Sequence, residues 1–175
     1  MIRRKWRKRA KWKTLLLGLV GMIMLTGCTV RESMAEQQIY GSNELIAQSG
    51  DRYSFDFREG TIEEGTAAFD FGQFTGKQTL WTVDAPEAAQ VTLELALGID
   101  NGKCKVVHIL PGGDVVKLAD AGAEADGEPI ILDLPKGENV IKLIGKKAYG
   151  TVRAEFADTE AVTIRSAAIE TDSAH

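Results

Sequence analysis

The chain has few of the residues on which disulfide-rich and metal-binding proteins depend. Its 175 residues include two cysteines and two histidines. Two cysteines cannot build a disulfide scaffold or a structural zinc site. Two histidines are too few for a histidine-rich metal site, and they argue against a Ser-His-Asp triad. The sequence therefore excludes the disulfide-scaffold and structural-zinc classes and argues against histidine-based hydrolysis.

Basic residues are scarce beyond position 27. Residues 1–27 carry eight Lys and Arg and no acidic residue, so the rest of the chain has 13 basic and 25 acidic side chains, a formal net charge of −12. A body this acidic repels phosphate groups and gains nothing from counterion release. We therefore expect no nucleic-acid partner.

Long apolar runs are also missing. The main one, residues 14–26, has 13 residues and follows a basic segment. It is shorter than the roughly 17–25 residues that a helix needs to span a bilayer. A basic start, a short apolar core and a small residue at the exit are typical of a secretory signal peptide. We predict that residues 1–27 are such a peptide.

The end of this run, Leu25-Thr26-Gly27-Cys28, resembles the lipobox of bacterial lipoproteins. In that family a diacylglyceryl group is attached to the cysteine sulfur, and a dedicated signal peptidase cleaves just before the cysteine. The resemblance implies that Leu25, Thr26 and Gly27 are recognised by the peptidase and that Cys28 is the lipid anchor. Two acyl chains suffice for stable anchoring, here on the extracytoplasmic face of the cell membrane. The alternatives are an uncleaved membrane anchor and an ordinary secretory signal.

Residues 28–50 are polar, rich in small residues and weakly patterned. We interpret them as the lipidated N-terminus and a flexible tether, in which residues 42–48 could form a short helix. Residues 166–175 are expected to form a flexible tail. The folded domain is therefore predicted to span residues 51–165.

Within that domain the apolar residues recur with the period of two that is typical of strands. The clearest run alternates over residues 91–99, and Asn101-Gly102 after it is a strong hairpin-turn signal. Pro111-Gly112-Gly113-Asp114 predicts a second tight turn. About eight or nine short strands and no convincing helix favour an all-β fold, an antiparallel, jelly-roll-like β-sandwich.

Two stretches of the domain resemble small Gram-positive lipoproteins: residues 76–113, with the Asn101-Gly102 and Pro111-Gly112-Gly113 turns, and residues 134–145. The cadence of the second stretch also resembles galactose-binding-like β-sandwiches, which include many carbohydrate-binding modules. The resemblance covers residues 51–157 and rests on strand rhythm and turn residues. It implies a fold, and a fold alone does not determine a ligand.

Aromatic residues that could stack on a sugar are few. Trp81 is the only tryptophan beyond the predicted signal peptide. Its place between Leu80 and Val83 favours core packing, because a sandwich of this size needs large buried side chains; an exposed platform is the alternative. Tyr149, in an expected late loop beside Lys146-Lys147, is the second candidate for ligand binding.

Carboxylates offer the only candidates for hydrolysis or calcium binding. They form two groups: Glu59, Glu63 and Glu64, and then Asp120, Glu124, Asp126 and Glu128. Paired carboxylates could hydrolyse glycosides, and hard oxygen ligands suit calcium. Because these residues lie in Gly- and Ala-rich turns, we interpret them as solvated charges. We expect no cofactor besides the lipid.

Cys104 and His108 lie four residues apart on one predicted strand, a separation of roughly 13 Å that excludes a catalytic hydrogen bond. We expect Cys104 to be a buried small hydrophobe and His108 to be partly buried with its hydrogen bonds satisfied.

Together these observations predict a non-catalytic surface lipoprotein. Its β-sandwich would bind cell-wall or other carbohydrate. The alternative is an accessory subunit that contacts a membrane transporter or a sensor complex. A hydrolytic enzyme has the least support.

Overall fold

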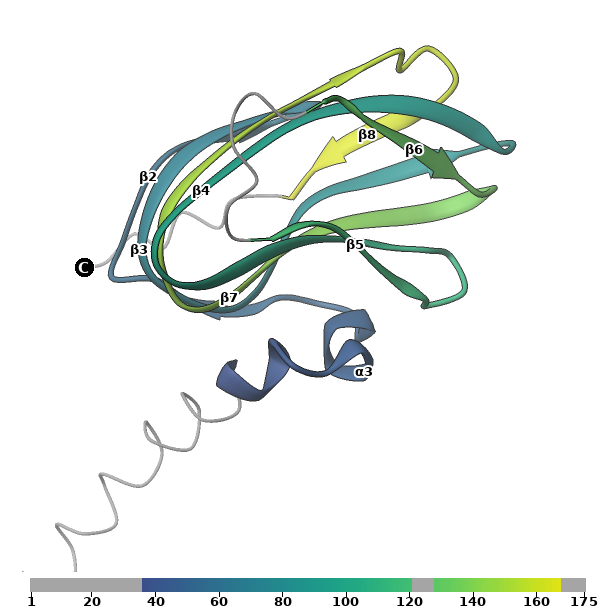
Figure 1. The fold of residues 1–175 in the computed structure, drawn as a ribbon. Helices are drawn as coiled ribbons and strands as arrows, with labels where there is room; N and C mark the ends of the chain where they lie inside the picture. Colours follow the sequence, from purple (N-terminus) through teal and green to yellow (C-terminus); the bar gives the residue numbers. More distant parts are fainter. Residues whose placement is uncertain (1–35, 121–127, 168–175) are drawn as a thin grey trace, which may run out of the picture. The chain divides into compact units, whose positions relative to one another are not determined.

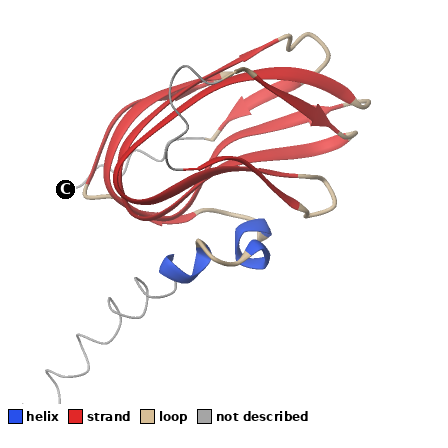
Figure 2. Cartoon of the chain, viewed as in Figure 1, coloured by secondary structure: helices blue, strands red, loops and turns tan. Residues whose placement is uncertain are grey.

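The computed structural model describes residues 36–120 and 128–167 of the chain. The predicted signal peptide, Cys28 and residues 168–175 of the predicted tail lie outside the described residues. The described part is mostly antiparallel β-sheet with little helix (Figure 2). The predicted all-β sandwich class is confirmed.

The elements in chain order are α3 (Asn43–Ala47), β1 (Arg52–Ser54), β2 (Phe57–Glu63), β3 (Thr66–Ala85), β4 (Ala89–Ile109), β5 (Val115–Asp120), β6 (Ile130–Leu134), β7 (Gly137–Ala157) and β8 (Thr163–Ser166). Hydrogen bonds join β1, β3, β7, β4 and β5 in that order, and β2 and β8 also pair with β3 and β6 with β4. The pairings are antiparallel.

Three long strands fold this sheet over itself into two layers (Figure 1). β3, β4 and β7 have 20, 21 and 21 residues, and each runs through both layers. The first layer contains β2, the start of β3, the end of β7, the start of β4 and β6. The second layer contains β1, β8, the end of β3, the start of β7, the end of β4 and β5.

The predicted hairpin at Asn101-Gly102 is wrong. β4 runs continuously through both residues, with register shifts against β7 on either side of Asn101. Gly102 has a φ of +79°, and a Cβ there would lie 2.1 Å from the carbonyl oxygen of Lys147. The pair therefore forms a bulge, which bends one strand instead of reversing the chain.

β7 bends at the same place without ending. The apolar stretches 140–144 and 151–156 both belong to this one strand, in which Lys147 adopts a φ of +50° at the bend. The turn predicted at residues 111–114 is confirmed: the Leu110 N–H donates to the Asp114 carbonyl oxygen at 2.9 Å. Residues 36–120 and 128–167 form eight strands, several of them longer than expected.

Trp81 lies in the core between the layers, with none of its surface exposed. Its indole ring packs edge-on against Phe156, with ring centroids 5.1 Å apart. Its Nε1–H donates to the Glu63 carbonyl oxygen at 2.8 Å, so the buried donor is satisfied. Trp81 is thus a core residue, the interpretation that its sequence position favours.

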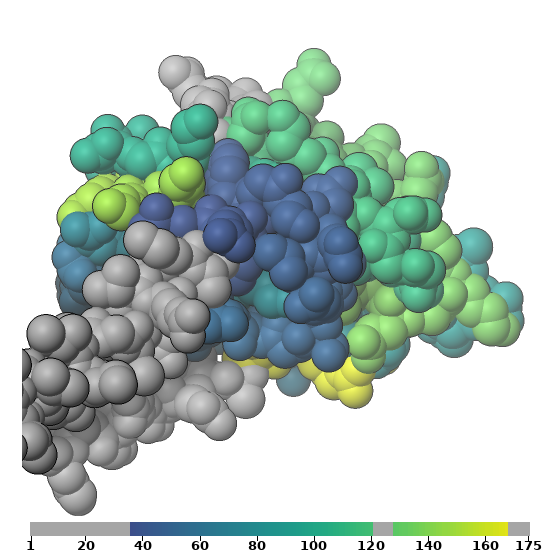
Figure 3. Space-filling view, turned by 90° about the horizontal axis from the view of Figure 1, so that it is seen from below, coloured from purple at the N-terminus to yellow at the C-terminus, as the bar shows by residue number. Residues whose placement is uncertain are grey.

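Residues 36–50, in the segment interpreted as a tether, pack against the outer face of the second layer (Figure 3). The short helix expected there is confirmed as α3, whose N-cap Ser42 accepts a hydrogen bond from the Leu45 N–H. Ile39 and Ile46 are buried against Val107, Ile109 and Ile144 of the sheet. This contact requires apolar residues on the outside of a strand, which strand alternation alone does not predict.

Two lysines of the sheet hold this segment in place. Lys77 Nζ donates to the carbonyl oxygens of Leu45 and Gln48 at 2.8 and 2.6 Å, and Lys142 Nζ donates to that of Gly50 at 3.0 Å. Each lysine is only 4% exposed. Burial lowers the pKa of Lys77, and the nearby Lys142 charge lowers it further. The ammonium groups thus satisfy carbonyls that pair with no strand.

Candidate functional site

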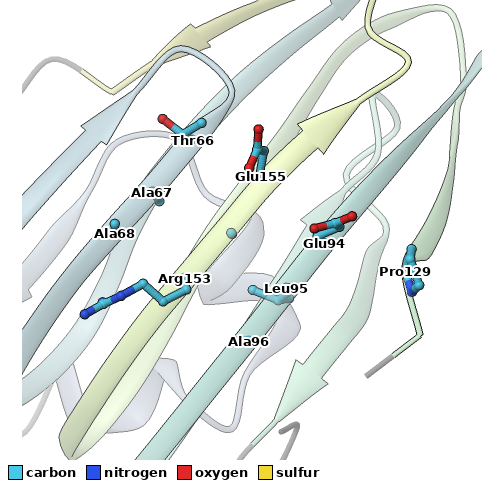
Figure 4. A pocket seen from close by; sticks show the side chains of 10 residues that line it. Thr66, Ala67, Ala68, Glu94, Leu95, Ala96, Pro129, Arg153 and Glu155 are labelled. Atoms are coloured by element: carbon cyan, nitrogen blue, oxygen red, sulfur yellow. The ribbon is translucent and has the colours of Figure 1, made fainter. Parts of the chain in front are cut away.

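An open groove with a volume of about 520 Å³ lies on the outer face of the first layer (Figure 4). β3, β7 and β4 form its floor, and Pro129 lies at one side. Thr66 and Glu155 also border a second hollow of about 380 Å³, lined in addition by Glu64, Thr159 and Val162. The two hollows therefore adjoin.

Strand register explains the shape of the groove. Thr66, Glu155 and Glu94 face one another across three neighbouring strands. The next outward-facing row consists of Ala68, Arg153 and Ala96. Ala68 and Ala96 flank Arg153 in that row, and their small side chains leave the sheet surface hollow there.

Glu94 and Glu155 give the groove its acidic part. They occupy directly opposed positions on β4 and β7, where like charges destabilise a sheet. Both side chains are exposed, and within residues 36–120 and 128–167 neither has an ion-pair partner. Their oxygens are therefore free to accept hydrogen bonds from a ligand.

Arg153 supplies donors on the other side of the groove. Its side chain extends over β3, away from the two glutamates (Figure 4). Nη2 contacts Asp70 Oδ1 at 2.9 Å, and Nη1 donates to the carbonyl oxygens of Phe69 and Val152 at 3.1 and 2.8 Å. The guanidinium is thus held in one orientation, with acceptors and donors on opposite sides of the groove.

The two aromatic residues predicted to bind a ligand do not meet in this groove. Trp81 is buried in the core, so its ring offers no platform. Tyr149 is half-buried at the bend of β7, opposite Asn101. Sequence alternation places Glu94, Arg153 and Glu155 on an outward face, but only the strand register shows that they are neighbours.

The candidate carboxylates are exposed where the structure describes them. Glu59 and Glu63 lie on β2, and Glu64 borders the second hollow. Asp120 contacts Lys117, and Glu128 is exposed. Glu124 and Asp126 lie outside the described residues. Among the described residues, no group of three or more His, Cys, Asp and Glu side chains could hold a metal ion.

Cys104 and His108 are both in the interior. Burial raises the pKa of the Cys104 thiol far above its usual value, which keeps the sulfur protonated and unreactive. His108 Nε2 lies 2.9 Å from Asn139 Oδ1. Because Asn139 Nδ2 donates to the carbonyl oxygens of Pro135 and Gly137, Oδ1 is the acceptor and His108 Nε2 carries the proton. Burial lowers the pKa of His108, so the neutral form is favoured.

No helix within the described residues is both long enough and apolar enough to cross a membrane.

No protein-family model matches the chain, and no curated protein matches it by sequence. Two solved structures share part of its architecture. A family 35 carbohydrate-binding module from an environmental isolate is 12% identical, with a TM-score of 0.35, and the match covers 66% of this chain and 82% of that one. The CBM35 module of Cellvibrio japonicus Abf62 is 19% identical, with a TM-score of 0.31, and the match covers 69% and 92% of the two chains. The similarity to these two modules concerns the fold alone.

Proposed function

We propose that the protein is a membrane-anchored binding module that holds carbohydrate in the groove of its first layer. The observation that carries this proposal is the arrangement of Thr66, Glu94, Arg153 and Glu155 around a low alanine floor. Sugar hydroxyls donate and accept hydrogen bonds, and they fit a surface that offers free carboxylate acceptors beside a fixed guanidinium. The two adjoining hollows together offer room for more than one sugar unit.

Charged hydrogen-bonding partners supply the expected affinity, because hydrogen bonds to ionised groups are stronger than those between neutral groups. Within the described residues, the groove presents no aromatic ring as a stacking platform. The interaction would therefore depend on polar contacts. Cell-wall polysaccharide is the nearest ligand for a module held at the outer face of the membrane.

The anchor in this proposal is a diacylglyceryl group on Cys28. Support comes from the Leu25-Thr26-Gly27-Cys28 motif after a short apolar run. Because residues 36–50 pack against the sheet, only the residues between Cys28 and Glu36 would separate the lipid from the folded unit.

Replacing Cys28 by alanine in the bacterial host is expected to abolish lipid labelling and to block cleavage before position 28. Metabolic labelling with an alkynyl or radioactive palmitate, followed by membrane fractionation, measures both. Cys104→Ala is the matched control and should label like the wild type, because that thiol is buried. Equal labelling of wild type and Cys28→Ala would refute the anchor.

Glu94→Gln combined with Glu155→Gln is expected to weaken carbohydrate binding by about tenfold or more, because two ionised acceptors become neutral. The measurement is sedimentation of residues 29–175 with insoluble peptidoglycan and with common polysaccharides over a range of protein concentrations. Glu59→Gln is the control, because Glu59 is an exposed glutamate of the first layer that does not line the groove.

Saturable sedimentation that the double variant weakens and the control preserves would support the proposal. If the wild type sediments with none of these matrices, carbohydrate binding is refuted. A protein partner at the membrane, such as a transporter or sensor subunit, would then become the leading function.

A further inference from the structure

Exposed lysines gather where β4 and β7 bend from one layer to the other. Lys103 lies directly opposite Lys146, and Lys147 follows in the chain. We call these three residues the bend lysines. Their side chains are exposed, and none forms an ion pair with another described residue. Like charges directly opposed on two strands destabilise a sheet, so packing does not account for them.

The basic surface continues from the bend onto the outer face of the second layer. Lys105 Nζ lies 4.8 Å from the centroid of the Tyr40 ring. Lys117 of β5 is exposed and paired with Asp120. The groove of the first layer instead carries Glu94 and Glu155, which have no ion-pair partner among the described residues. Five lysines of a body with a formal net charge of −12 thus lie along the bend and the adjoining outer face of the second layer.

The docked N-terminal segment starts at the same bend. Glu36 Oε2 accepts a hydrogen bond from Ser54 Oγ at 3.0 Å. Ser54 lies opposite Thr75, whose Oγ1 accepts from the Lys147 N–H at 3.1 Å. Glu36, the first described residue, therefore lies close to the bend lysines.

The chain between Cys28 and Glu36 is short. Eight residue steps reach at most about 29 Å when fully extended. A lipid at Cys28 would hold Glu36 within that distance of the membrane surface, and the bend lies close to Glu36. The bend lysines would then lie near the lipid headgroups.

We propose that the bend lysines bind the anionic headgroups of the membrane. A lysine near an anionic bilayer strengthens binding by about fivefold. The groove and the adjoining hollow lie away from the bend, toward the β2–β3 turn and the β7–β8 connection. The contact would therefore turn the groove away from the lipid. This inference goes beyond carbohydrate binding and holds whether or not the groove binds sugar.

The test uses residues 29–175, which keep every contact of the compact unit that begins at Glu36 and lack the lipid. Binding is measured by sedimentation with vesicles of phosphatidylcholine, alone or mixed with an equal amount of phosphatidylglycerol. The key variant combines Lys103→Gln with Lys146→Gln. The control combines Lys136→Gln with Arg165→Gln, which removes the same net charge from exposed ion pairs elsewhere.

We expect the wild type to prefer the anionic vesicles despite its net negative charge and to lose this preference at high salt. The key variant should bind them about ten- to thirtyfold more weakly, and the control should stay within twofold of the wild type. The key variant should also melt at or above the wild-type temperature, because it removes a like-charge pair.

Equal sedimentation of the wild type with both kinds of vesicle would overturn the proposal. Equal losses in the two variants would also overturn it, since net charge alone would then explain the binding. Competition by millimolar inorganic phosphate at constant ionic strength would count against a lipid surface and would indicate a small-anion site. None of these results depends on the polysaccharide assay.

Discussion

Replacing Trp81 by alanine is expected to lower the free energy of unfolding by about 3–5 kcal/mol, the range for removing a large aromatic side chain from a core. The ring is fully buried and packs edge-on against Phe156. The substitution leaves a large cavity and also removes the donor that satisfies the Glu63 carbonyl oxygen. Urea unfolding of residues 29–175, followed by circular dichroism, measures the loss.

Phe57→Ala is the matched control for this substitution, because Phe57 is an aromatic residue that is 51% exposed. It should cost well under half as much as Trp81→Ala. A loss below about 1 kcal/mol for Trp81→Ala would contradict the placement of this ring in the core. If Trp81→Ala does not fold, Trp81→Phe, which keeps an aromatic ring but lacks the indole donor, provides the measurable comparison.

Replacing Gly102 by alanine is expected to destabilise the fold by about 2–4 kcal/mol, because backbone strain and overpacking add at this position. The φ of +79° disfavours any residue with a Cβ, and the added atom would lie 2.1 Å from the Lys147 carbonyl oxygen. That oxygen belongs to the backbone of the adjacent strand, so relief requires the two strands to separate at the bend. Thermal and urea unfolding both report the change.

Gly112→Ala serves as the control, since a Cβ at Gly112 would meet nothing within 4 Å. It should change the free energy of unfolding by less than about 0.5 kcal/mol. If Gly102→Ala and Gly112→Ala behave alike, the bulge at Asn101-Gly102 is not needed for the bend in β4.

The incorrect hairpin prediction at Asn101-Gly102 shows where local patterns stop being sufficient. Alternation over residues 91–99 correctly identifies strand, and Asn101-Gly102 correctly identifies a place where glycine geometry is needed. Whether such a dipeptide reverses the chain or bends one strand depends on the partner strand. Here β7 continues alongside through Gly145 and Gly150, so β4 also continues.

The groove was beyond sequence prediction for a related reason. Glu94, Arg153 and Glu155 are outward-facing by alternation, but they come from segments about 60 residues apart in sequence, and only antiparallel register brings them together. The search for aromatic residues that could stack on a sugar selected Trp81 and Tyr149. The structure places neither of them in the groove.

The docked segment 36–50 illustrates the same limit from the other side. The composition of this segment resembles that of a linker, yet Ile46 is fully buried. The carbonyl oxygens of Leu45 and Gln48 accept hydrogen bonds from Lys77. The matching apolar residues, Val107, Ile109 and Ile144, lie on strands far along the chain. The sequence of residues 36–50 therefore does not show which surface covers Ile46, because that surface forms only when the strands pair.

By itself the sequence determined the all-β class, the turn at residues 111–114 and the core position favoured for Trp81. These features depend on periodicity and on residue type over a few neighbouring positions, which local steric and solvation effects govern. Only the tertiary structure decided that three strands run through both layers, that residues 36–50 cover the second layer, and which charges share a groove. Those outcomes depend on the register between distant strands, because a shift of one residue would turn every side chain of a strand to the opposite face.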